Sequence, residues 1–200
     1  MPAAAADHDV MNRLEATRIV VEAAGVAPIV ASLGHPAYDL FAAGDRPQNF
    51  YTWGSMGVAS SIGVGLALAK PETRVFVVDG DGSLLMNLGS LATIGLLQPP
   101  NLVLVVMDNE AYATTGGQAT PTAHGADLAA AARAMRVDAI VAATGEELRR
   151  GLARVERARV ILAKVRESPP SAKPPLDCVF IKHRFMTAIG NPEPATRTGS

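Results

Sequence analysis

Apolar residues occur in short unbroken runs along the chain, and longer segments with helical character lie between them. Unbroken runs are typical of strands that are buried on both faces of a sheet, because neither face needs polar side chains. Such runs predict strands at residues 28–33, 74–78, 102–107, 137–142 and 160–165. Helical spacing or small-residue composition predicts helices at residues 13–25, 37–43, 58–69, 84–97, 126–135 and 146–158.

Strands that alternate with helices indicate βαβ units, which build parallel sheets covered by helices. The expected fold class is therefore α/β, a three-layer α/β/α domain with a mainly parallel sheet at residues 11–190. A Gly/Thr-rich stretch at 110–125 and a Pro-rich stretch at 167–175 predict surface loops. Residues 1–10 and 191–200 are predicted to be disordered tails.

Composition narrows the class of protein. The 200 residues are 48% hydrophobic and 18% charged, with a formal net charge of -1, which is typical of a soluble globular domain. Basic residues are scattered, so a nucleic-acid partner is not expected. No apolar run approaches a membrane span, and the N-terminus lacks the pattern of a signal peptide. We expect a cytoplasmic enzyme or binding domain, with the single cysteine, Cys178, as a buried or bystander thiol.

Polar side chains directly follow two of the predicted strands. Asp79 and Asp81 follow the second strand, and Asp108 and Asn109 follow the third. Ligands of open parallel sheets bind at the carboxyl ends of the strands, where all four residues fall. The oxygens of Asp81 and Asn109 suit Mg²⁺, which completes its coordination with phosphate oxygens and water.

Glycines and the start of a helix surround these oxygens. Gly80 and Gly82 permit close approach of the backbone, and Ser83 opens a helix whose first amides favour a phosphate. The combination predicts a metal-bridged diphosphate. Asp and Asn at strand ends also serve turns and helix caps for purely local reasons. The joint order of strand, GDGS, helix, strand and DN at one sheet edge favours a binding site.

This pattern resembles the cofactor motif of thiamine diphosphate-dependent enzymes, in which GDG is followed after 26 residues by an asparagine, here Asn109. The resemblance implies that the side chains of Asp81 and Asn109 and the main-chain carbonyl of Ala111 bind Mg²⁺. The family pattern usually has asparagine in place of Asp108 and often glycine in place of Ala111. The resemblance also places the diphosphate against Gly80, Gly82 and Ser83.

A second stretch, FYTWGSMGVASSIGVGLALA (50–69), is similar to the segment that precedes the motif in the same family. The resemblance implies cofactor contacts from Gly54, Ser55 and Met56. The Gly54 carbonyl would accept a hydrogen bond from the aminopyrimidine ring, and Met56 would be the apolar wedge that keeps the cofactor bent. Ordinary core filling is the alternative for Met56.

The glycines of this stretch also suggest a dinucleotide fingerprint around Gly63 and Gly65. That interpretation fails on spacing, because Leu68 stands where the third glycine belongs and no clear strand precedes the motif. Gly63 and Gly65 are instead expected to permit close packing of the helix on the sheet.

Two turns at the same edge are further candidates. In relatives the SLGHP turn (32–36) lies near the diphosphate, which implies roles for Gly34 and His35; a surface histidine is the alternative. The YATTGGQ loop (112–118) follows the metal-binding asparagine, and long polar loops at such an edge tend to cover the site. Candidates for contact with cofactor or substrate are therefore Tyr112, Thr115 and Gln118.

Complete enzymes of this family usually carry two similar α/β domains, one for the diphosphate and one that supplies a glutamate to activate the pyrimidine ring. This chain has room only for the first, and none of its glutamates matches the activating one. The resemblance implies a hetero-oligomer with a separate pyrimidine-domain α subunit. Within the family, the sequence looks most like the group of sulfopyruvate decarboxylase β subunits and phosphonopyruvate decarboxylase, which implies decarboxylation of a small anionic 2-oxo acid.

The reaction and its substrate stay open at this point. A carboligase or a 2-oxo acid oxidoreductase subunit would use the same cofactor, although one cysteine means that any iron–sulfur cluster lies on another chain. A non-catalytic phosphate-binding protein is the alternative from a different class, and the lack of a P-loop or dinucleotide fingerprint counts against it. Candidate partners for a sulfonate or phosphonate, unless the α subunit supplies them, are His35, Arg46, His183 and Arg184. For each of them taken singly, a solvent-exposed charge is the more usual interpretation.

Overall fold

The computed structural model describes residues 10–153, 156–169 and 172–190. A six-stranded sheet forms the centre of this part of the chain, and neighbouring strands in it are parallel. The strand order is β2-β1-β3-β4-β8-β7, with β1 Ile29–Ala31, β2 Asn49–Tyr51, β3 Val75–Gly80, β4 Leu102–Asp108, β7 Asp138–Ala142 and β8 Arg159–Lys164. The predicted parallel sheet is confirmed, with β2 as an additional strand.

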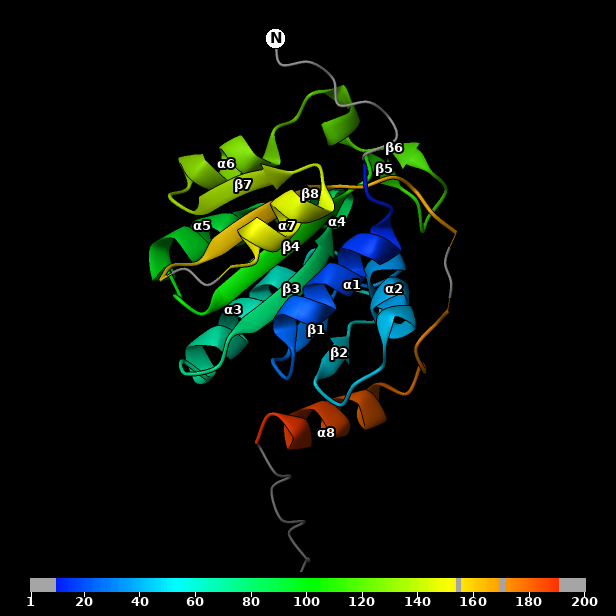
Figure 1. The fold of residues 1–200 in the computed structure, drawn as a ribbon, viewed down its shortest axis with the longest axis vertical. Helices are drawn as coiled ribbons and strands as arrows, with labels where there is room; N and C mark the ends of the chain where they lie inside the picture. Colours follow the sequence, from blue (N-terminus) through cyan, green and yellow to red (C-terminus); the bar gives the residue numbers. More distant parts are fainter. Residues whose placement is uncertain (1–9, 154–155, 170–171, 191–200) are drawn as a thin grey trace, which may run out of the picture.

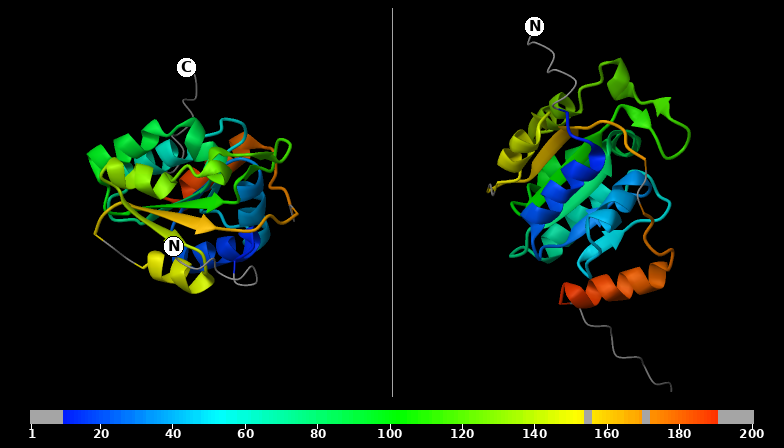
Figure 2. Two further views of the ribbon diagram at one scale, coloured as in Figure 1. Left: turned by 90° about the horizontal axis from the view of Figure 1, so that it is seen from above. Right: turned by 45° about the vertical axis from the view of Figure 1, so that its right-hand side comes forward.

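Helices cover both faces of the sheet and give the three layers expected from the sequence (Figures 1 and 2). One face carries α1 Arg13–Ala24, α2 His35–Ala43 and α7 Gly145–Gly151. The opposite face carries α3 Ala59–Ala69, α4 Asp81–Met86, α5 Gly89–Leu97 and α6 Leu128–Ala134. Beside β2, at the edge of the sheet, lies α8 Cys178–Ala188.

Alternate side chains of the central strands enter different cores. In β4, Val103 and Val105 pack into the core that α1 and α2 cover, whereas Leu104 and Val106 pack into the core beneath α3 and α5. All four side chains are buried. Because helices cover both faces, the strand needs no polar position, and this explains its unbroken apolar run.

The helix predicted at 84–97 differs from the structure in its start and in its continuity. α4 begins at Asp81, directly after β3, so Gly80 ends the strand and DGS (81–83) opens the helix. α4 ends before Asn87, and α5 begins at Gly89. The Asn87 side chain donates to the Gly57 carbonyl at 2.8 Å. Asparagine side chains that bond to backbone groups compete with the helix, and this bond accompanies the interruption.

The apolar pattern does not predict two of the elements. β2 has only three residues, which is too short for a recognisable period. α8 begins after the capping residue Asp177 and buries Ile181 and Phe185, one helical turn apart. The ring of Phe185 packs against Phe50 of β2, with 5.2 Å between the ring centroids. This contact covers the edge strand that the sequence pattern leaves unrecognised.

Smaller differences concern the connections. α7 ends at Gly151, well before the predicted end at residue 158. Cys178 is exposed, so it is a bystander rather than a buried thiol. The predicted loop at 110–125 contains an antiparallel hairpin and a 3-10 turn, namely β5 Ala111–Tyr112, β6 Gln118–Ala119 and η1 Pro121–His124.

The tails predicted at 1–10 and 191–200 lie outside the described residues, apart from Val10. The carbonyl of Val10 accepts a hydrogen bond from Arg166 Nε at 3.0 Å. None of the helices in the described part of the chain is long and apolar enough to cross a membrane.

Gly63 and Gly65 of α3 have different surroundings. A Cβ added at Gly63 would lie 2.2 Å from Cγ2 of Val77 in β3. A Cβ added at Gly65 would meet nothing within 4 Å. Close packing of the helix on the sheet therefore requires glycine at position 63 only, and the expectation for Gly65 is wrong.

We expect Gly63→Ala to destabilise the protein by about 1–3 kcal/mol, because buried, β-branched Val77 has little freedom to move aside. The matched change Gly65→Ala should stabilise it by about 0.5–1 kcal/mol, because alanine reduces the freedom of the unfolded chain. Urea denaturation of the two variants and the unmodified protein measures both effects. Equal shifts of the two midpoints would contradict the assignment of the contact to Gly63.

Candidate functional site

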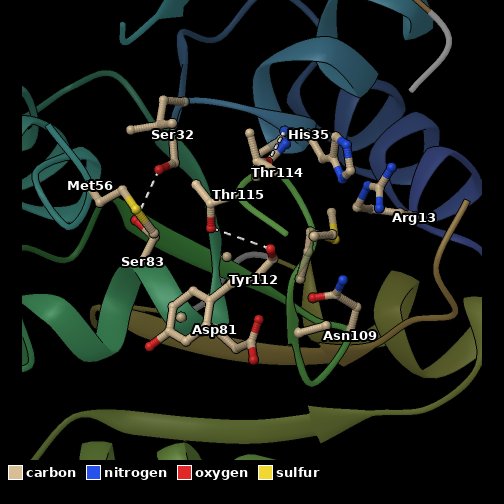
Figure 3. Close-up of a pocket in the computed structure, with 17 residues that line it drawn as sticks. Arg13, Ser32, His35, Met56, Asp81, Ser83, Asn109, Tyr112, Thr114 and Thr115 are labelled. Atoms are coloured by element: carbon tan, nitrogen blue, oxygen red, sulfur yellow. Dashed lines mark hydrogen bonds between the residues drawn. The ribbon is translucent and has the colours of Figure 1, made fainter. Parts of the chain in front are cut away.

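A pocket opens at the carboxyl-terminal edge of the sheet, where segments that follow β1, β3 and β4 converge (Figure 3). It encloses about 520 Å³, including space open to solvent. Four residues predicted for the site, Gly34, Gly54, Ser55 and Gln118, are not part of its wall. The other predicted cofactor and metal residues do line it: His35, Met56, Gly80, Asp81, Gly82, Ser83, Asn109, Ala111, Tyr112 and Thr115.

The carboxylate of Asp81 is buried in this wall, with 1% of the residue exposed. Its Oδ2 accepts hydrogen bonds from the hydroxyls of Thr120 at 2.5 Å and Thr122 at 2.9 Å. Burial raises the pKa of Asp81 above its ordinary value, and the two hydroxyls act in the opposite direction. Both hydroxyls bind the same oxygen, so Oδ1 is bound by neither of them.

Asn109 and Ala111 also line the wall. The Asn109 Nδ2 donates to Oε2 of Glu167 at 2.5 Å, so the amide oxygen is not used in this contact. Ala111 is the first residue of β5 and pairs with Ala119 in an extended strand, so position 111 does not require glycine. The left-handed backbone occurs one residue earlier, at Glu110, where φ is 60°.

The hydroxyl of Ser83 connects two loops of the site to the first turn of α4. It accepts from the N–H of Gly57 at 2.9 Å and shares a hydrogen bond of 3.0 Å with the hydroxyl of Ser32 (Figure 3). The hydroxyl is therefore engaged within the protein. An anion at Ser83 would accordingly meet the backbone N–H in the first turn of α4.

The turn at residues 54–57 has a backbone that L-amino acids rarely adopt. Its φ values are 70° at Gly54, 56° at Ser55 and 83° at Gly57, all in the left-handed region that favours glycine. A Cβ added at Gly57 would lie 2.8 Å from Cβ of Asn87. This turn packs tightly on the end of α4 and presents Met56 to the pocket (Figure 3).

The β5–β6 hairpin approaches the pocket through contacts that only glycine permits. A Cβ at Gly82 would lie 2.3 Å from the ring of Tyr112, and a Cβ at Gly34 would lie 2.3 Å from the hydroxyl of Thr114. The same hydroxyl accepts from the His35 N–H at 3.4 Å. Gly34 thus shapes the site by admitting the hairpin, although it is not part of the wall.

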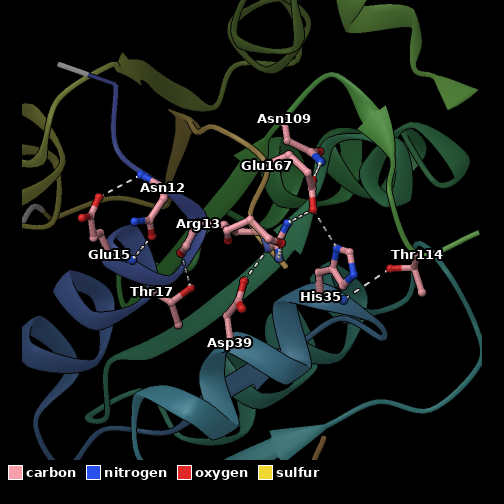
Figure 4. Close-up of polar contacts among 10 residues, drawn as sticks. Asn12, Arg13, Glu15, Thr17, His35, Asp39, Asn109, Thr114 and Glu167 are labelled. Atoms are coloured by element: carbon pink, nitrogen blue, oxygen red, sulfur yellow. Dashed lines mark hydrogen bonds and ion pairs between the residues drawn. The ribbon is translucent and has the colours of Figure 1, made fainter. Parts of the chain in front are cut away.

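An ion-pair network borders the pocket (Figure 4). Arg13, the first residue of α1, is 2% exposed and lines the wall. Its Nε donates to Asp39, its Nη1 to Oε1 of Glu167 at 2.7 Å and its Nη2 to the carbonyl of Ser168 at 2.7 Å. Nδ1 of His35 lies 3.4 Å from the same oxygen of Glu167.

The network sets the charge of its members. Burial alone would raise the pKa of Glu167, but hydrogen bonds from Arg13 and Asn109 hold it below its ordinary value. Burial and the charge of Arg13 lower the pKa of His35, so the imidazole is neutral near pH 7. Burial raises the pKa of Asp39, and the Arg13 guanidinium opposes that shift.

The other two strand-end acids do not line the pocket. Oδ1 of Asp108 lies 3.0 Å from the hydroxyl of Thr122, whose one proton it shares with Asp81, and Oδ2 pairs with Lys164 at 2.8 Å. Asp79 is fully buried, where its Oδ1 accepts from the Gly80 N–H at 2.9 Å. Burial raises the pKa of Asp79. Both acids therefore lie behind residues of the pocket wall and do not face the pocket itself.

Three of the cations considered for an anionic substrate are remote from the pocket wall. Arg46 bonds to the side chain of Asn49 at 2.9 Å, at the amino-terminal end of β2. Arg184 pairs with Asp45 at 2.6 Å, and His183 belongs to the same helix, α8. None of these three residues lines the pocket.

The sequence reasoning also missed residues that shape the site. Glu167 follows the predicted strand at 160–165 and lies at the same sheet edge, so the strand-end argument could have found it. Arg13 has the appearance of an ordinary first residue of a surface helix. Thr120 and Thr122 lie in a polar loop whose path no pattern predicts.

The pocket offers a cation few charged ligands. No group of three or more His, Cys, Asp or Glu in the described ranges could hold a metal ion. A cation at Asp81 would therefore depend on the amide oxygen of Asn109, on the carbonyl of Ala111 and on oxygens that a ligand brings. This donor set fits a hard cation bound together with a phosphate.

Comparison with known proteins identifies the class. Residues 36–167 match the family model described as "Thiamine pyrophosphate enzyme, C-terminal TPP binding domain". The chain is 42% identical to the sulfopyruvate decarboxylase subunit beta of Methanocaldococcus jannaschii, over 89% of this chain and 97% of that one. It is 36% identical to the phosphonopyruvate decarboxylase of Streptomyces hygroscopicus, over 92% of this chain and 47% of the relative.

A solved structure agrees on the fold. The thiamine diphosphate-dependent 4-hydroxybenzoylformate decarboxylase of Rhodococcus jostii RHA1 superposes with a TM-score of 0.68 at 17% identity, over 84% of this chain and 35% of that one. At this identity, the likeness concerns the fold alone. The family model and the similarity over nearly the whole length of a relative together show that the chain belongs to the thiamine pyrophosphate enzyme family, as a C-terminal TPP-binding domain.

Proposed function

We propose that the chain is the β subunit of a cytoplasmic, thiamine diphosphate-dependent 2-oxo acid decarboxylase of the sulfopyruvate or phosphonopyruvate type. The observation that carries the proposal is the pocket at one sheet edge whose wall contains Asp81, Asn109 and Ala111. The high identity over almost the whole length of a sulfopyruvate decarboxylase subunit beta supports the choice of reaction.

In this proposal Mg²⁺ binds to Asp81, Asn109 and the carbonyl of Ala111. The diphosphate lies against the backbone of the GDGS turn, where Gly80 and Gly82 carry no side chain. The 54–57 turn, of which Met56 lines the pocket, would hold the pyrimidine ring. The full set of cofactor contacts is Gly34, His35, Gly54, Ser55, Met56, Gly80, Gly82, Ser83, Tyr112 and Thr115.

When bound, thiamine diphosphate supplies the carbanion and the electron sink that decarboxylation of a 2-oxo acid requires. The residues of this chain bind and orient that cofactor. Asp81 and Asn109 fix the metal, Met56 forms an apolar wall, and the β5–β6 hairpin limits the access of water. Thr120 and Thr122 keep the carboxylate of Asp81 in place for the metal.

The activating glutamate comes from a separate α subunit in this proposal. Glu167 contacts pocket residues, but Arg13 and Asn109 engage its two oxygens. Glu110 pairs with Lys164 at 2.8 Å. Neither carboxylate is therefore available to a pyrimidine ring, which supports a hetero-oligomer that completes the site.

The α subunit also supplies the main charge partner for the sulfonate or phosphonate. Arg13 lines the pocket, but it already donates to Asp39, Glu167 and the Ser168 carbonyl. His35 is held neutral by burial and by the nearby guanidinium. A second negative group on the substrate would thus find little free positive charge on this face.

We expect Asp81→Asn to lower the apparent affinity for Mg²⁺ by at least about 100-fold. Even the mutation of a residue that only hydrogen-bonds to a metal ligand typically lowers metal affinity by about 10- to 100-fold. Stability should be unchanged or higher, because burial disfavours the charged form of Asp81 and an amide oxygen still accepts from the two threonines. Calorimetric titration of Mg²⁺ with thiamine diphosphate, together with thermal denaturation, tests both effects. Unaltered Mg²⁺ affinity would remove Asp81 from the metal site.

We expect the chain alone to release no carbon dioxide from sulfopyruvate or phosphonopyruvate, and the complex with its α subunit to do so. The physical reason is that the described glutamates near the pocket are already paired. Native affinity purification with mass spectrometry identifies the partner, and a coupled aldehyde assay measures turnover. Decarboxylation by the isolated chain would contradict the division of the site, and carbon–carbon bond formation would indicate a carboligase.

A further inference from the structure

Glu167 has a set of contacts to which the proposed function gives no role. It follows β8, and its side chain is 47% exposed, yet it contacts Arg13, Asn109 and His35 (Figure 4). These three residues come from α1, the end of β4 and the start of α2. Such convergence at a half-exposed side chain points to a function in the site.

The contact between Glu167 and Asn109 favours one of the two orientations of the Asn109 side-chain amide. A primary amide has a donor end and an acceptor end, whereas an ionised carboxylate accepts only. Nδ2 of Asn109 donates to Oε2 of Glu167 at 2.5 Å. The amide oxygen is thereby directed away from Glu167. The reversed amide would place two acceptors in contact, which is unfavourable.

Arg13 holds the carboxylate of Glu167 in the place that this contact needs. Arg13 donates to Oε1 of Glu167 at 2.7 Å, and Asp39 and the Ser168 carbonyl fix the rest of the guanidinium. The arginine is almost fully buried and begins a helix that Asn12 caps. A planar guanidinium held at three nitrogens is a rigid support for a carboxylate.

We infer that Glu167 is a positioning residue, which with Arg13 orients the amide of Asn109 so that its oxygen is presented to the Mg²⁺ of the cofactor. This inference rests on the proposed function. Glu167 is not itself a metal ligand in this arrangement, because donors already occupy both of its oxygens. It acts through Asn109, as carboxylates act on metal-binding groups in other proteins.

The test uses Glu167→Gln, which keeps the size of the side chain. A glutamine can donate as well as accept, so the amide of Asn109 is free to reverse. In the complex with the α subunit, we expect about a 10- to 100-fold increase in the Kd for Mg²⁺, measured by calorimetry at saturating thiamine diphosphate. The thermal midpoint, measured without metal, should change little because the side chain is half exposed.

A second variant separates orientation from general loss of charge or of structure. Glu167→Gln is combined with Asn109→Asp, which places an oxygen at both ends of the side chain at position 109. The amide at position 167 can then donate to one of these oxygens while the other faces the cation, so the double variant should have a Kd for Mg²⁺ within about threefold of the unmodified protein. The matched control Glu110→Gln removes a carboxylate one residue from Asn109 that pairs with Lys164, and it should also have less than about a threefold effect.

The outcomes distinguish this inference from the proposed function. An unchanged Mg²⁺ affinity in Glu167→Gln, with loss of binding in Asp81→Asn, would overturn the role of Glu167 and leave the metal site intact. A double variant with the same loss as Glu167→Gln alone would also overturn it, since it would show an effect independent of amide orientation. Unaltered binding in Asp81→Asn would instead remove the metal site itself.

Discussion

The parallel register between β3 and β4 is the constraint on which the site depends. Val75 pairs with Leu102 and Gly80 with Met107, so each residue of β3 lies beside the residue 27 positions later. Continuing the same offset brings Asp81 beside Asp108 as both strands end. The spacing between GDG and Asn109 is therefore the length of chain that leaves one strand, forms α4 and α5, and returns in register.

The walls of the site are fixed by side chains that are themselves bound. Ser83 joins the loops after β1 and β2 to the first turn of α4, and Thr120 and Thr122 hold Asp81 from the opposite side. Burying carboxylates costs free energy unless they are hydrogen-bonded or paired. The raised pKa of Asp81 reflects that cost. The structure maintains an unfavourable buried charge where a cation would compensate it.

Much of the fold could be predicted from the sequence, because both sheet faces are covered and the apolar runs are consequently unbroken. The sequence pattern did not predict β2 or α8. β2 is only three residues long. α8 covers the sheet edge by packing Phe185 against Phe50, a contact between residues that are distant in the chain. The side-chain oxygens at the ends of β3 and β4 could be located because the sequence shows where each apolar run stops and polar residues begin. Arg13 could not, since its burial depends on Asp39 and Glu167, which are distant in the chain.

The hydroxyls of Thr120 and Thr122, which bind Asp81, affect which cation the site would prefer. Both bind Oδ2, which leaves Oδ1 as the carboxylate oxygen that neither hydroxyl engages. Ca²⁺ takes six to eight oxygens and often binds both oxygens of one carboxylate, whereas Mg²⁺ is content with one or two carboxylates, each through one oxygen, in a compact octahedron. In the proposed metal site, Thr120 and Thr122 would thereby make the larger ion a poor fit, and selectivity between the two cations would follow from two hydroxyls outside the coordination shell.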